Sequence, residues 1–129
     1  MSSLKEAVGI VCKRLKAEFP ECKFSVRQDT ASMMWAMDVM IMSAPFDAFH
    51  KDETRFGKKG YHQLNQYQFD RPSARKKLIN NGACVTPELW DTMKRAAEIA
   101  IEEYPPDNQM TFVNFAIGRW DRGFVNTHS

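Results

Sequence analysis

Long apolar runs, paired cysteines and signatures of catalysis are all missing from this sequence of 129 residues. No apolar stretch approaches the roughly 20 residues that span a bilayer, and the stretch from Met1 to Glu6 lacks the apolar region of a signal peptide. The three cysteines, Cys12, Cys22 and Cys84, show no C-x-x-C spacing and fit neither a disulfide framework nor a zinc clip. We therefore expect a cytoplasmic protein, with no membrane contact and with reduced, mostly buried thiols.

Catalytic motifs of known mechanism are missing as well. The sequence contains no G-x-S-x-G, no G-x-x-x-x-G-K-[ST], no G-x-G-x-x-G and no H-E-x-x-H. The stretch Gly57-Lys58-Lys59-Gly60 is rich in glycine, but it lacks the strand before it and the helix after it that a phosphate cradle requires. We expect no catalytic residue and no cofactor, and hence a protein that is not an enzyme.

The most metal-like group in the sequence is His50, Asp52 and Glu53, with His62 further along the chain. Imidazole and carboxylate groups can together hold a divalent cation, although two histidines without a repeated spacing are more typical of a solvated loop. Cys84 beside a histidine would be a nucleophilic pair, which the sequence supports still less. We expect no metal site, and an enzyme with an unrecognised metal site stays as an alternative.

The first part of the chain has clear helix and strand periods. Apolar residues recur every three or four positions from Leu4 to Phe19, which predicts a helix that Pro20 ends. Alternation predicts a strand over Cys22 to Arg27 and a second one over Met34 to Met42. The second strand is apolar on both faces apart from Asp38, so we expect it to be central, or to have its second face covered by a helix or a partner.

After Met42 the sequence pattern is clear for some elements and leaves alternatives for others. Residues 44–60 show no sustained period and indicate a long irregular connection. Tyr61 to Phe69 favours a third strand, with a short helix over Leu64 to Phe69 as the alternative. A short basic helix is expected from Asp70 to Leu78. A longer helix is expected from Thr86 to Tyr104, and a last strand from Met110 to Trp120.

The order α-β-β-β-α-α-β predicts an α+β fold. We expect a single domain over residues 1–125, with a mostly antiparallel sheet of about four strands and helices packed on one of its faces. Residues 126–129 are predicted to be a frayed tail.

Positive charge is concentrated in the middle of the chain. Residues 50–77 hold eight basic and three acidic residues, against six and six in residues 1–49 and four and seven in residues 78–129. Clustered cations suit phosphates and aromatic rings suit unstacked bases, so the mixture is suited to nucleic acid, although a solvated or protein-facing surface has the same composition. The candidate contact residues are Arg55, Lys58, Lys59, Tyr61, Tyr67, Arg71, Arg75, Lys76 and Lys77.

Two further stretches are candidates for binding. Arg119, Trp120 and Arg122 lie beside glycines near the end of the chain, a composition favoured at binding hot spots, or else the indole caps the core. The apolar second face of the strand from Met34 to Met42 offers a surface for a homo-oligomer.

Three stretches together carry a family resemblance, namely Leu15 to Arg27, Asn65-Gln66-Tyr67, and Ile117 to Phe124. They resemble one of the large polyvalent protein-associated domains, small α+β modules carried by phages, plasmids and other mobile elements. The resemblance implies a mobile-element context, with no established enzyme activity and no catalytic residue to transfer. The sequence departs from that pattern where Met33-Met34 and Met42-Ser43-Ala44-Pro45 stand in place of a glycine pair and a W-x-D-G-P turn, so no role of that turn is carried over.

The leading interpretation is a non-enzymatic binding module of a phage or plasmid that acts by occupying a host macromolecule. An inhibitor of a bacterial defence system is one form of it, and a host or phage protein is the expected partner. The alternatives are a nucleic-acid-binding accessory protein that uses residues 55–77, and the enzyme with an unrecognised metal site.

Overall fold

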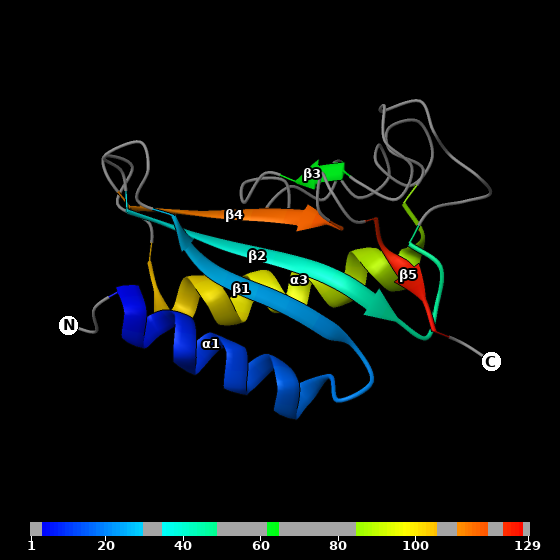
Figure 1. Cartoon of the computed structure of the whole chain (residues 1–129), viewed down its shortest axis with the longest axis horizontal. Coiled ribbons are helices and arrows are strands. Elements are labelled where there is room, and N and C mark those ends of the chain that lie inside the picture. The colour runs from blue at the N-terminus through cyan, green and yellow to red at the C-terminus, as the bar shows by residue number, and fades with distance from the viewer. Residues whose placement is uncertain are drawn as a thin grey trace.

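The computed structural model describes residues 4–29, 35–48, 62–64, 85–105, 111–118 and 123–127. In this part of the chain two helices lie on one face of a five-stranded sheet, as Figure 1 shows. The predicted α+β class and the packing of helices on one face are therefore confirmed. The elements are α1 (Leu4–Glu18), β1 (Lys23–Asp29), β2 (Trp35–Ala44), β3 (His62–Leu64), α3 (Pro87–Glu103), β4 (Thr111–Ile117) and β5 (Val125–Asn126).

The sheet is mixed, which corrects the prediction of a mostly antiparallel one. Its strand order is β1-β2-β4-β3, and β5 also pairs with β2. The β1–β2 and β3–β4 pairs are antiparallel, whereas β2 runs parallel to both β4 and β5. The physical reason is the crossover through α3, which returns the chain to the end of the sheet where β2 begins. As a result Thr111 starts β4 beside Trp35 and continues in the direction of β2.

The middle of the core is formed where β2 and β4 lie side by side. Their register places alternate residues of both strands on the helical face, where each is at most 2 % exposed: Met37, Val39, Ile41, Val113, Phe115 and Ile117. β2 has β1 on one side and β4 on the other, so the prediction of a central strand is confirmed. Both faces of this strand are apolar in the sequence, and the helices cover the face that carries Met37, Val39 and Ile41.

Both helices bury the faces that their apolar spacing predicts, and α3 buries more. In α1 the buried residues are Leu4, Ala7, Val11 and Leu15. Trp90 and Ile99 of α3 are also buried, although they lie outside the apolar stripe that the sequence predicts, which includes Leu89, Met93 and Ala100. The reason is that α3 packs both on the sheet and on α1, so a wider part of its surface is covered.

Several predictions for the middle of the chain cannot be compared with the structure. The predicted third strand is confirmed at His62–Leu64, which pairs with β4, and the rest of Tyr61 to Phe69 lies outside the described residues. The predicted basic helix from Asp70 to Leu78 and most of the irregular connection also lie outside them.

The end of the chain returns to the sheet. Gly118, with a φ of 73°, takes the left-handed conformation that glycine favours, and its N–H donates to the Ile41 carbonyl at 2.9 Å. β5 then pairs with the last residues of β2, where Asn126 Nδ2 donates to Asp47 Oδ1 at 2.7 Å. The N–H of Thr127 donates to the Ala44 carbonyl at 2.8 Å. The first two residues of the predicted frayed tail are thus hydrogen-bonded, and the domain limits themselves stay a prediction.

The first turn of α3 depends on Thr86, which is 7 % exposed. Its hydroxyl accepts from the Leu89 N–H at 3.3 Å and donates to the Asp47 carbonyl at 2.5 Å, so it caps the helix and ties it to the segment after β2. We expect Thr86→Ala to lower the free energy of unfolding by about 1–2 kcal/mol, because both bonds are lost. Thr86→Ser keeps both bonds and should lose much less. Urea unfolding measures the difference, and equal stability of the two variants would contradict the prediction.

Candidate interaction surfaces

All twelve candidate contact residues lie outside the described residues, and their roles therefore stay predictions. They are Arg55, Lys58, Lys59, Tyr61, Tyr67, Arg71, Arg75, Lys76, Lys77, Arg119, Trp120 and Arg122. The metal-like residues His50, Asp52 and Glu53 and the thiol of Cys84 lie outside as well, while His62 contributes its backbone to β3.

Within the six described ranges, no three histidine, cysteine, aspartate or glutamate side chains group closely enough to hold a metal ion. Neither of the two helices in those ranges combines the length and the apolar character needed to cross a membrane. Cys12 and Cys22 are free thiols. Cys12 is exposed on α1, contrary to the prediction of mostly buried thiols, whereas Cys22 is half-buried and burial raises the pKa of its thiol.

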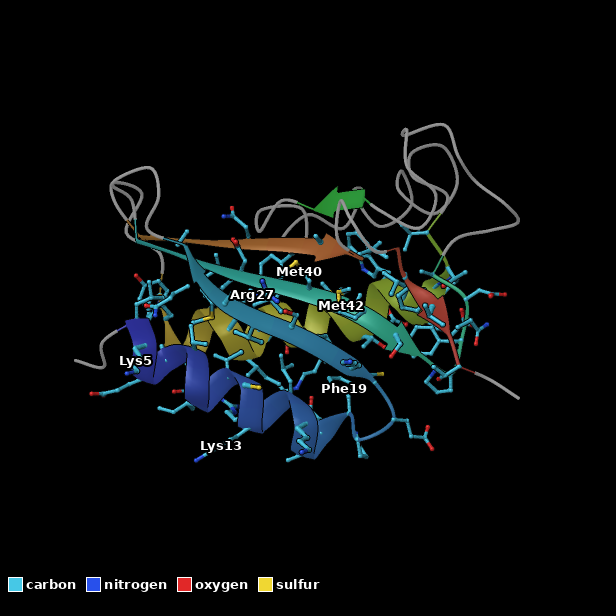
Figure 2. The ribbon with its side chains drawn as sticks, viewed as in Figure 1. Lys5, Lys13, Phe19, Arg27, Met40 and Met42 are labelled. Atoms are coloured by element: carbon cyan, nitrogen blue, oxygen red, sulfur yellow. The ribbon has the colours of Figure 1, made fainter. Side chains whose placement is uncertain are left out.

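The face of the sheet opposite the helices carries a mixture of polar and apolar side chains. Figure 2 shows Met40 and Met42 along β2, with Arg27 on the neighbouring β1. Asn114 Nδ2 of β4 donates to Asp38 Oδ1 of β2 at 3.0 Å. Met42 is buried and Met40 is half-buried, so little of the apolar surface proposed for a homo-oligomer is open. β2 also has a strand on each side, so a second copy could reach β2 only at the face opposite the helices. The homo-oligomer stays a prediction.

Ion pairs join α1 to α3 and decide which way the charges of α1 face. Arg14 Nη1 lies 2.9 Å from Glu103 Oε1, and Arg95 Nε lies 2.6 Å from Glu18 Oε2. Arg14 and Glu18 are four residues apart and therefore share one flank of the helix. That flank faces α3.

The opposite flank of α1 is basic. At about 100° of rotation per residue, Lys5, Cys12 and Lys16 lie opposite Arg14 and Glu18. This flank faces away from α3, and α1 itself packs beneath β1 whereas α3 packs beneath β2 and β4.

Two cations of β1 itself, Lys23 and Arg27, are also exposed, as are Lys5 and Lys16. None of the four forms an ion pair with another residue that the structure describes. We call β1 together with Lys5, Lys16, Lys23 and Arg27 the edge surface. Counting charges along residues 1–49 did not indicate this surface, because six basic and six acidic residues balance there in the sequence.

A family model described as large polyvalent protein associated domain 29 matches residues 2–97. No curated protein and no solved structure matches the chain. The matched residues include α1, β1, β2, β3 and the first part of α3, and β4 and β5 follow them. Of the three stretches that carried the resemblance, Leu15 to Arg27 and Asn65 to Tyr67 lie within the match, and Ile117 to Phe124 lies after it.

The pair between Glu18 and Arg95 predicts a pH dependence of stability. The hydrogen bond from Arg95 lowers the pKa of Glu18 in the folded protein and outweighs desolvation, which raises it; the positive charges of Arg95 and Arg14 lower it further. A carboxyl group whose folded-state pKa is depressed stabilises the protein above its unfolded-state pKa, and that contribution is lost as the pH falls through the folded-state pKa. Salt should weaken it, because both groups are solvent-exposed.

We therefore expect wild type to be more stable than Glu18→Gln at neutral pH, and this advantage to shrink as the pH falls below the ordinary glutamate pKa of about 4.3. Urea unfolding across a pH series checks it. Glu21→Gln is the matched control, because Glu21 makes no ion pair within the ranges that the structure describes. The same pH dependence in the control comparison would show that general charge, and not the pair, is responsible.

Proposed function

The chain belongs to the family of large polyvalent protein associated domain 29, and on this basis we propose that it is a non-enzymatic binding module of a phage or plasmid. Domains of this family belong to polyvalent proteins of mobile elements. The proposed module acts in the cytoplasm of the host by occupying a host macromolecule. Inhibition of a bacterial defence system is the specific form that we favour.

The edge surface is the observation that supports this proposal best. A protein that acts by occupation needs a surface that is already in its binding conformation, because ordering on binding reduces affinity. The sheet provides such a surface, since both described helices seal one face and β2 and β4 fill the core beneath it. The cations of the edge surface are exposed on this frame.

A nucleic-acid partner is the second candidate. It is supported by the eight basic residues of residues 50–77. Phosphate contacts release counterions, so such binding weakens steeply as salt rises.

If the chain acts by occupying its target, the two should form a complex of fixed stoichiometry. The host macromolecule recovered with the tagged chain should form a complex of constant composition in light scattering. Its activity should fall in proportion to the added chain until one binding equivalent is reached, and then stay constant. The intact mass of the partner should be unchanged, and its activity should return on dissociation. Inactivation by a small fraction of an equivalent, or a change in the partner's mass, would indicate an enzyme and contradict the proposal.

The nucleic-acid candidate predicts anisotropy changes with labelled single-stranded and double-stranded DNA and RNA that decline steeply across a salt series. Reversing the charge of four lysines in residues 50–77 should abolish these anisotropy changes: Lys58→Glu, Lys59→Glu, Lys76→Glu and Lys77→Glu. A matched control reverses four exposed lysines elsewhere and changes the net charge equally: Lys5→Glu, Lys13→Glu, Lys16→Glu and Lys94→Glu. If the wild type shows no binding even at low salt, this candidate is removed.

A further inference from the structure

β1 is the last strand on its side of the sheet. It pairs with β2 along all seven of its residues, and no strand in the described ranges pairs with its other edge. In an antiparallel strand every second residue directs its N–H and C=O away from the neighbour, so this edge carries a row of backbone donors and acceptors. A row of this kind is a template on which another extended chain can pair.

The edge is held in its extended conformation from below. Phe24 and Val26 of β1 pack against the core that α1 and α3 cover. The ring of Phe19, at the end of α1, lies against that of Phe24 with 5.9 Å between their centroids. β1 is therefore ordered before any partner arrives, and only the incoming segment loses conformational freedom when it binds.

The charges around the edge restrict which chain can pair with it. Lys5 and Lys16 are exposed on the flank of α1 that faces away from α3, and Lys23 and Arg27 are exposed on the strand itself. Cations on an edge strand oppose pairing with a neutral or basic chain. A second copy would bring the same four cations to the same edge. An acidic chain instead meets these cations with opposite charge.

We propose that the free edge of β1 accepts an acidic, extended segment of a protein partner as an additional strand. This inference rests on the proposed function, since it names the surface and the partner chemistry by which the module would occupy its target. Backbone hydrogen bonds to β1 hold the segment, and its carboxylates lie within reach of the edge cations.

A library of random peptides about ten residues long, enough to span β1, tests the chemistry directly. The library is displayed on phage and selected on the immobilised wild-type chain. We expect the selected peptides to alternate Asp or Glu with β-branched residues. Selection of basic or neutral sequences, or no enrichment over an uncoated surface, would overturn the proposal.

A selected peptide is then synthesised with a fluorescent label, and its dissociation constant is measured by anisotropy. We expect the Lys16→Glu, Lys23→Glu double variant to bind about tenfold or more weakly, because two attractive charges become repulsive. The Lys13→Glu, Lys94→Glu double variant is the control. Each replacement removes two units of charge, so both variants shift the net charge from +2 to −2. Equal weakening in both would mean general electrostatic attraction and would refute a specific edge.

Backbone methylation distinguishes strand addition from a contact between side chains only. In an added strand one of two alternating sets of N–H groups faces β1. Peptides methylated on one set should lose binding, and peptides methylated on the other should keep it. Unchanged binding of both would rule out strand addition.

Two results would assign the edge to another occupant. One is a dimer mass for the wild type that the Lys16→Glu, Lys23→Glu variant lacks. The other is displacement of the peptide by single-stranded DNA alone.

Failure of strand addition at β1 can be distinguished from failure of the proposed function. If no acidic peptide binds the edge while a host macromolecule still forms a stoichiometric complex with the chain, the proposed function stands and the edge is not its contact surface. If that complex survives both double variants unchanged, the same conclusion holds. Absence of any complex would remove the proposed function itself.

Discussion

The burial of one face of β2 is the constraint on which the rest of the structure depends. Met37, Val39 and Ile41 are completely buried, which requires a strand on each side and a helical layer beneath. β1 and β4 supply the strands, and α1 and α3 supply the layer. The parallel alignment of β4 follows from this arrangement, since α3 must cross the buried face before the chain can re-enter the sheet. Among the strands that the structure describes, none pairs with the outer edge of β1.

The packing of α1 against α3 also determines which charged side chains of α1 form ion pairs. Because Arg14 and Glu18 are held by residues of α3, they are turned away from the edge of β1. Lys5 and Lys16 on the opposite flank of α1, like the exposed cations of β1, form no ion pair with other residues that the structure describes. A balanced N-terminal segment thereby presents a positively charged surface in the folded protein. The electrostatic character of that surface is a property of the fold and not of the composition.

The family match and the edge surface involve the same part of the chain. Lys5, Lys16, Lys23 and Arg27 all lie within residues 2–97, whereas β4, which fills the other half of the core, follows the match. The edge surface thus lies in the part of the chain that the match covers. The basic segment of residues 50–77 lies within the match as well, so the nucleic-acid interpretation and the edge proposal are both tied to it.

The sequence by itself determined the types of the main elements and the principal buried stripe of each helix. The three-to-four spacing from Leu4 to Leu15 and the alternation from Met37 to Ile41 report directly on helix and strand geometry, because each is a local periodicity. Thr86 and Pro87 marked the start of α3, because capping also depends only on residues close together in the chain. Strand partners, the burial of Trp90 and the edge surface were decided only by the tertiary structure. They depend on which elements lie side by side, and contacts between residues far apart in the chain leave no period in the sequence.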